Sequence, residues 1–138
     1  MSVEQIDWLE SNGFHVGCHS VSHPHLDQIP KDECVRELRD SKDTLEQHIG
    51  HEIKHLAYPY GSYNDTVIAA AQELGFLTAC TTDVALCELK YKSLALPRVN
   101  IGYEDNLVDF ICKLYTEFSP NRATNIVIKK ILSRIGMN

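Results

Sequence analysis

The chain lacks several features that mark whole classes of protein. No apolar run among its 138 residues is long enough to span a bilayer, and no basic start followed by an apolar stretch marks a signal peptide. No internal repeat or low-complexity segment is visible. The formal net charge of −6 argues against nucleic acid or an anionic membrane surface as a partner. We therefore expect one domain over residues 1–138 and, for the chain as given, a cytoplasmic location.

The five cysteines do not form a pattern typical of a zinc cluster or a disulfide framework. Their number is odd, and no two of them make a Cys-x-x-Cys pair. Cysteine is also among the residue types most often buried. We expect free, mainly buried thiols in a reducing compartment at Cys18, Cys34, Cys80, Cys87 and Cys112.

Predicted strands and helices alternate along the chain. Short apolar stretches predict strands at 14–18 and 76–81, and another within 51–58 that is centred on 53–57. Residues 93–96 and 99–101 flank a bend at Pro97 and Arg98. Apolar residues at helical spacing, bounded by capping residues, prolines and glycines, predict helices at 2–11, 30–48, 64–74, 104–118 and 120–135. This alternation predicts an α/β fold with a parallel sheet. The charged face of the second helix is expected to be solvated.

The residues from 17 to 26 contain a candidate metal site. His19 falls at the carboxyl end of the first predicted strand, where α/β sheets place their ligands. His23 follows four residues later, and Pro24 disfavours a helix through both histidines. Imidazole is the commonest metal ligand and suits zinc. Spacing alone leaves two interpretations open, a metal-binding pair or turn histidines without a ligand.

Three blocks of sequence together resemble one family. The block His-Ser-Val-Ser-His-Pro-His-Leu at 19–26 resembles the histidine motif of polysaccharide deacetylases, the NodB-homology group of carbohydrate esterase family 4. The block at 56–64 resembles that family's Pro-Tyr-Gly motif, and 96–101 is similar to its Leu-Pro-Arg segment. The resemblance covers about 4–101 and leaves 102–138 as a helical C-terminal extension. It implies a partial distorted (β/α) barrel, with parallel strands alternating with helices and two C-terminal helices.

The resemblance also implies a chemistry. Members of the family hydrolyse N-acetyl groups on N-acetylated polysaccharides or oligosaccharides, and so break a C–N bond that is not a peptide bond. They use a divalent metal, most often zinc, held by two histidines and one aspartate. The metal roles carry over to His19 and His23, and catalytic roles carry over to the Tyr60 backbone N–H and to Arg98. The implied substrate-binding residues are Tyr58, Pro59, Tyr60 and Gly61.

Parts of the family pattern are absent from this sequence. The Thr-Phe-Asp-Asp-Gly motif, which supplies the general base and the third ligand, does not occur, nor does the later Leu-x-His motif. We therefore expect weak or absent zinc binding and little activity in the isolated chain. The alternative is a non-catalytic remnant or interaction module that keeps the fold. We also expect a second copy, or the missing N-terminal half, to cover the open sheet edge.

Several single residues have two interpretations. His25, Asp27 or Asp83 could replace the missing ligand, but turn, cap or solvent-exposed roles are favoured. Tyr58, Tyr60 and Tyr63 could form a wall for sugar stacking, or Tyr58 could belong to the core. The remaining histidines are expected to be ordinary strand or surface residues: His15, His48, His51 and His55.

Overall fold

The computed structural model describes residues 2–116. The chain divides into two compact units, one formed by 1–83 with 89–97 and the other by 84–88 with 98–138. The boundary after residue 97 lies close to residue 101, where the family resemblance ends. None of the described helices is long and apolar enough to cross a membrane.

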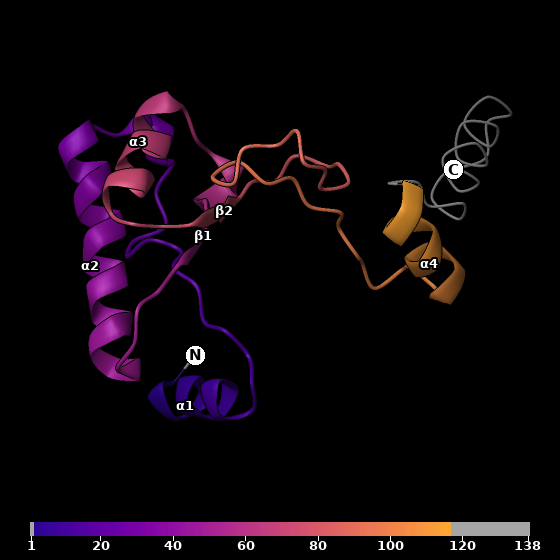
Figure 1. Cartoon of the computed structure of the whole chain (residues 1–138), viewed down its shortest axis with the longest axis horizontal. Coiled ribbons are helices and arrows are strands. Elements are labelled where there is room, and N and C mark those ends of the chain that lie inside the picture. The colour runs from indigo at the N-terminus through magenta and orange to yellow at the C-terminus, as the bar shows by residue number, and fades with distance from the viewer. Residues whose placement is uncertain (1, 117–138) are drawn as a thin grey trace, which may run out of the picture. The chain divides into compact units, whose positions relative to one another are not determined.

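A small parallel sheet lies in the first unit (Figure 1). Strands β1 (His55–Ala57) and β2 (Thr78–Cys80) pair in parallel, with Leu56 opposite Ala79. Cys18 adds a single parallel bridge to Leu56, and Leu96 adds another to Cys80. The elements therefore pair in chain order, and the predicted α/β architecture with a parallel sheet is confirmed.

The strands are shorter than the sequence predicts. Predicted strand 14–18 forms only the Cys18 bridge, and residues 93–96 form only the Leu96 bridge. Pro59 follows β1 almost at once and has no N–H to extend the ladder. Residues 99–101 form no strand, and the Asn100 carbonyl accepts a hydrogen bond from Lys113 Nζ (2.8 Å) instead. Residues 14–17 have no strand partner within 2–116, so the predicted cover for this edge remains a prediction.

Two helices pack side by side on the sheet (Figure 1). Helix α2 (Lys31–Ile49) ends at Gly50, which is left-handed with φ 77°. Helix α3 (Asp65–Glu73) begins with Asn64, whose side-chain oxygen accepts the Val67 N–H (3.0 Å). Both helices agree with the predicted boundaries. The core between them and the sheet contains Cys34, Leu38, Ile53, Leu56, Val67, Ala70, Ala71, Phe76 and Ala79.

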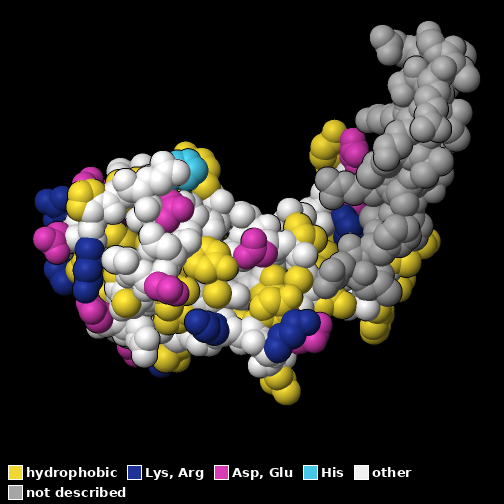
Figure 2. All heavy atoms as spheres, turned by 90° about the horizontal axis from the view of Figure 1, so that it is seen from above, with side chains coloured by type: hydrophobic (Ala, Val, Ile, Leu, Met, Phe, Trp, Pro, Cys, Tyr) yellow, Lys and Arg dark blue, Asp and Glu magenta, His cyan; other side chains and the backbone are white. Residues whose placement is uncertain are grey.

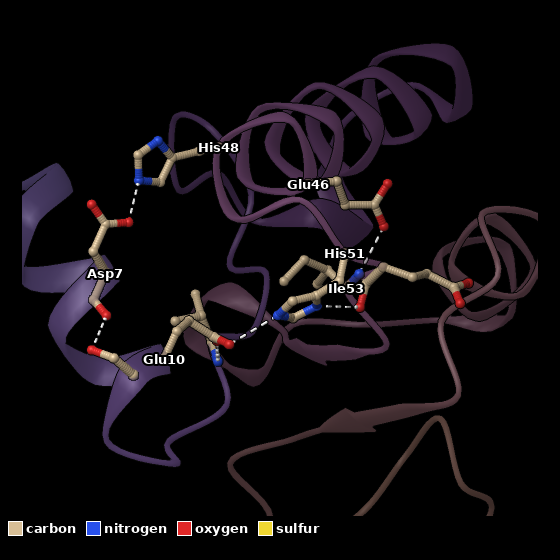
Figure 3. A network of polar contacts seen from close by, with 9 residues as sticks. Asp7, Glu10, Glu46, His48, His51 and Ile53 are labelled. Carbon is tan, nitrogen blue, oxygen red and sulfur yellow. Dashed lines mark hydrogen bonds and ion pairs between the residues drawn. The ribbon is translucent and has the colours of Figure 1, made fainter.

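Helix α1 (Val3–Ser11) forms where the sequence predicts it but has no buried residue. The Ser2 N–H donates to Gln5 Oε1 (2.8 Å) at its start. Its contacts with His48 and His51 are polar (Figure 3): Asp7 Oδ1 lies 2.8 Å from His48 Nε2, and Glu10 Oε2 lies 2.9 Å from His51 Nε2. The Trp8 ring also stacks on Phe14, with centroids 6.3 Å apart. His48 and His51, which the sequence predicts to be ordinary strand or surface residues, thus attach α1 to the rest of the unit.

The second unit contains helix α4 (Leu107–Thr116), which begins after the capping residue Asn106. Lys113, only 5% exposed, donates to Asp105 Oδ2 (2.6 Å). This ion pair lowers the pKa of Asp105, chiefly through the hydrogen bond from Lys113. The last predicted helix lies outside the described residues. Apolar side chains of α4 that are exposed are Leu107, Val108, Phe110, Ile111, Leu114 and Tyr115.

On the face that Figure 2 shows, acidic and basic side chains are interspersed with apolar ones. The expectation of mainly buried thiols is met only in part, because two of the five cysteines are buried. None of the five cysteines, which all lie within the described residues, forms a disulfide: Cys18 and Cys34 are buried, Cys80 and Cys112 are partly exposed, and Cys87 is exposed. Burial raises the pKa of the Cys18 thiol and keeps it protonated.

Candidate metal and substrate site

The structure brings the two predicted histidines together. His19 Nε2 and His23 Nε2 lie 3.1 Å apart, with their ring planes at 69°. Two nitrogens at about 2.0–2.1 Å from one tetrahedral zinc ion would be roughly 3.3 Å apart. The observed separation therefore fits a shared divalent cation. Both side chains are exposed, so an ion can reach them from solvent.

The backbone of β1 determines which ring nitrogen of His19 carries the proton. His19 Nδ1 lies 2.6 Å from the Ala57 carbonyl oxygen. A carbonyl can only accept, so Nδ1 carries the proton and Nε2 of the neutral ring keeps its lone pair. That lone pair is on the nitrogen that lies next to His23, which is the atom a metal ligand would use.

The loop between the histidines is held in an unusual conformation. Ser20 and His23 are left-handed, with φ 64° and 60°, which is disfavoured for residues other than glycine. Glu37 on α2 holds this loop, because its Oε2 accepts the N–H groups of Val21 and Ser22 at 2.9 Å each. The Ser22 hydroxyl donates to Glu37 Oε1 (2.7 Å). Partial burial raises the pKa of Glu37, but the hydrogen bonds from Ser22 and Val21 outweigh it, and the net shift is downward.

The Pro-Tyr-Gly segment forms a tight turn, η2 (Pro59–Gly61), directly after β1. Tyr60 is left-handed with φ 57°, and its carbonyl accepts the Thr82 hydroxyl (3.2 Å). The Gly61 N–H donates to the Tyr58 carbonyl (2.9 Å). A Cβ on Gly61 would lie 2.1 Å from Thr82 Oγ1, so only glycine fits. Within residues 2–116, the Tyr60 N–H donates to no acceptor.

Ring contacts link this turn to the histidine loop. The His23 and Tyr60 rings meet edge to face, with centroids 4.4 Å apart and planes at 75°. The His25 ring stacks on Tyr60, with centroids 4.1 Å apart and planes at 13°. The Tyr60 side chain is 57% exposed. Four aromatic rings, His19, His23, Tyr60 and His25, thus follow one another at the carboxyl end of the sheet.

Two of the predicted substrate-binding residues have buried side chains. Tyr58 is 1% exposed, and its hydroxyl donates to the Leu94 carbonyl (2.8 Å). Burial is the main reason that its pKa is raised far above the usual range. Pro59 is buried too, and Tyr63 stacks on Tyr58 with centroids 5.4 Å apart. Of the two interpretations of Tyr58, the structure supports a place in the core, so Tyr60 supplies the exposed ring.

The two candidate replacement carboxylates take part in turns. Asp27 accepts a hydrogen bond from the Ser62 hydroxyl. Asp83 accepts from Thr81 Oγ1 (3.0 Å) and Tyr63 Oη (3.3 Å). Within the described part of the chain, no three His, Cys, Asp or Glu side chains are grouped to hold a metal ion. The histidine pair is therefore an incomplete ligand set within these residues.

Arg98 is exposed and belongs to the second unit. Its predicted supporting role in catalysis remains a prediction.

Sequence reasoning missed the residues that hold the site in place. Glu37 was expected on a solvated helix face, His25 in a turn, and Thr82 had no assigned role. Glu37 and Thr82 lie 15 and 22 residues from the groups they bind. No local pattern signals such pairings, which depend on how the helices and loops pack.

The chain matches known proteins over most of its length. The family model for polysaccharide deacetylase matches residues 2–79, more than half of the chain. YxkH of Bacillus subtilis strain 168, described as a presumed polysaccharide deacetylase, is 24% identical over 102 residues. The match covers 74% of this chain and 37% of YxkH.

Solved structures of deacetylases also resemble this chain. The deacetylase PplD of Streptococcus pyogenes, solved in complex with acetate, superposes with a TM-score of 0.72 at 31% identity, over 73% of this chain and 45% of that one. A polysaccharide deacetylase of Bacillus cereus has a TM-score of 0.71 at 24% identity, and this likeness concerns the fold alone. The match covers 83% of this chain and 36% of the Bacillus cereus protein. The present chain thus spans less than half the length of each of these relatives.

The family model over residues 2–79, which includes the histidine and Pro-Tyr-Gly blocks, agrees with the structural likeness to solved polysaccharide deacetylases. The chain belongs to the polysaccharide deacetylase family.

Proposed function

We propose that this chain takes part in the metal-dependent hydrolysis of N-acetyl groups on an N-acetylated sugar polymer. His19 and His23 are two of the ligands of a divalent cation, with zinc the first choice for paired imidazoles. The observation that carries the proposal is the 3.1 Å separation of their Nε2 atoms, with the His19 lone pair set by the Ala57 carbonyl.

The side chains and backbone at the site have separate roles in this proposal. A bound zinc ion would polarise the acyl carbonyl and favour ionisation of water. The Tyr60 N–H would donate to the acyl oxygen as negative charge develops there. The exposed Tyr60 ring offers a face on which a sugar can lie. The reaction breaks the acyl C–N bond and leaves acetate and a free amine on the sugar.

A general base and a third ligand are still required. Residues 2–116 contain no three-residue metal group. A parallel strand added beside residues 14–18 would end next to His19, so carboxylates at its carboxyl end would reach the site. We propose that a segment covering this edge supplies them. Without a base, we expect activity to be lower by about 10²–10⁴-fold.

The alternative is a non-catalytic module that keeps the deacetylase fold. The absence of a third ligand within the described residues favours this alternative. Release of acetate from an N-acetylglucosamine oligomer by the zinc-loaded chain would exclude it. Zinc binding without any acetate release would support it.

The test of the proposal is a zinc competition titration on the full chain. The double variant H19A/H23A removes the proposed ligands. The double variant H48A/H51A is the matched control, because it removes two other exposed histidines, which contact α1 (Figure 3). We expect the first variant to lose zinc affinity at least tenfold and the control to keep it. Equal zinc affinity in the two variants would contradict the proposal.

A further inference from the structure

The contact between His25 and Tyr60 is unusual because both side chains are exposed. Their rings are nearly parallel, at 13°, with centroids 4.1 Å apart. Burial in the core does not enforce this contact, since Tyr60 is 57% exposed and His25 is also on the surface. The stacking must therefore be set by the backbone segments that carry the two rings.

The segment carrying His25 is well anchored. It leads into the short helix η1 (Leu26–Gln28), where the Gln28 N–H donates to the His25 carbonyl (3.0 Å). Leu26 is 1% exposed and fixes this helix in the core. Asp27 accepts from the Ser62 hydroxyl, just past the Tyr60 turn. Residues 25–27 thus hold the turn at two points, through the ring stack and through Asp27.

Tyr60 needs such support because its backbone is left-handed, with φ 57°. The Thr82 hydroxyl holds its carbonyl oxygen. On the other side of the residue, the Pro59–Tyr60 peptide N–H donates to no acceptor within residues 2–116. The carbonyl of the same peptide group accepts the Ser62 N–H (2.9 Å). The Tyr60 ring, between the His25 face and the His23 ring, adds a second constraint on the N–H side.

We propose that His25 is a positioning residue, whose stacked ring holds the Tyr60 ring against His23 and so restricts the Pro59–Tyr60 N–H. This inference rests on the proposed function, in which that N–H is the donor to the acyl oxygen. His25 acts through Tyr60 and through the flat shape of its ring, and it is not a metal ligand.

The matched variants are H25A, which removes the ring, and H25F, which keeps a flat aromatic ring without the imidazole nitrogens. H15A, at another exposed histidine, is the control for removing a surface imidazole. Nuclear magnetic resonance of each chain at one pH reports the Tyr60 ring-proton shifts and the exchange rate of the Tyr60 amide proton. Acetate titration of the zinc-loaded chain reports ligand binding next to Tyr60.

We expect H25A to move the Tyr60 ring signals toward unstacked values and to speed exchange of the Tyr60 amide about threefold to tenfold. Acetate affinity should fall by a similar factor, with zinc affinity changed less than about twofold. H25F and H15A should resemble the wild type. A general collapse of the loop would instead lower zinc affinity as well, and that outcome contradicts a positioning role.

The proposal is wrong if the Tyr60 ring and amide signals in H25A match those of the wild type. It is also wrong if H25F behaves like H25A, because the effect would then need the imidazole nitrogens and not the stack. Equal zinc affinity in H19A/H23A and H48A/H51A would defeat the proposed function alone. The Tyr60 ring and amide signals would still decide the role of His25.

Discussion

Helix α1 and the histidine loop are attached to the first unit by different kinds of contact. The loop lies between Cys18 and Leu26, each 1% exposed, and the core holds both of its ends. Helix α1 has no buried residue and is joined through Asp7–His48 and Glu10–His51 (Figure 3). Apolar burial depends little on pH, whereas carboxylate–imidazole pairs depend on two protonation states. The site geometry should therefore persist above pH 6.5, where α1 loosens but the Glu37 carboxylate that holds the loop stays ionised.

The largest effect should come from removing core volume under the site. Leu38 on α2 is fully buried, and its carbonyl lies near the Cys18 thiol. We expect L38A to lower the free energy of unfolding by about 2–5 kcal/mol, from lost burial and the cavity left behind. Urea unfolding followed by far-ultraviolet circular dichroism measures this change.

The matched variant on α1 is V3A. Val3 is 51% exposed, so we expect a change within about 0.5 kcal/mol. A loss in V3A as large as that in L38A would mean that α1 is held by apolar packing, and the contrast between the two regions would fail.

An intermediate effect should come from the turn that carries Tyr60. Gly61 has φ 69°, and an added Cβ would lie 2.6 Å from the Thr82 backbone nitrogen. We expect G61A to destabilise the unit by roughly 2–4 kcal/mol, from left-handed strain and overpacking. The same unfolding measurement applies.

Gly50 is the control for the cost of a left-handed backbone without steric overlap of the added Cβ. It has φ 77°, and nothing would lie within 4 Å of an added Cβ. G50A should cost only about 1–2 kcal/mol. If G50A and G61A are equally destabilising, the close approach of Thr82 does not matter to the turn.

The smallest effect should be the pH dependence of α1. The hydrogen bond with Glu10 raises the pKa of His51 above its ordinary value of 6.5, and the hydrogen bond with His51 lowers the pKa of Glu10 below 4.5. A raised histidine pKa gives stabilisation that is complete below pH 6.5 and is lost as pH rises through the folded-state pKa. A lowered carboxyl pKa gives stabilisation that is present above pH 4.5 and is lost as pH falls.

Helix α1 should therefore be held most firmly between about pH 4.5 and 6.5 and should loosen above that range. Amide hydrogen exchange in α1, measured against α2 as an internal reference, tests this. E10Q should flatten the α1 profile and leave α2 unchanged. An α1 exchange profile in the wild type that shows no pH dependence beyond that of α2 would contradict the assigned contact.

Local signals account for what the sequence predicted well. Helix α3 was predicted from Asn64 as a cap, and α2 from Pro30 and Gly50, because capping and left-handed termination act within one turn of chain. The histidine pair was singled out because two histidines and a proline fall within six residues. The family resemblance then assigned a chemistry that spacing alone left open.

Long-range contacts account for what the sequence did not predict. Strand lengths depend on how many residues meet a partner, and only three do so in β1 and in β2. The Glu37 contacts, the His25–Tyr60 stack and the burial of Tyr58 all join segments brought together by packing. A hydrophobic pattern shows that a tyrosine can be buried, but the position of the neighbouring loop decides whether it is.

The chain-order pairing of the sheet has a consequence for how the protein folds. His19 meets Ala57 across 38 residues of sequence, and His55 meets Thr78 across 23. Each segment pairs with the segment that precedes it in the sequence. Each pairing therefore closes a loop of moderate length, and the entropic cost of each closure is modest. The first pairing places the Tyr60 turn beside the histidine loop. The 23-residue closure that pairs β2 with β1 has the lower entropic cost, and the 38-residue closure that brings His19 to Ala57 completes the carboxyl end of the sheet.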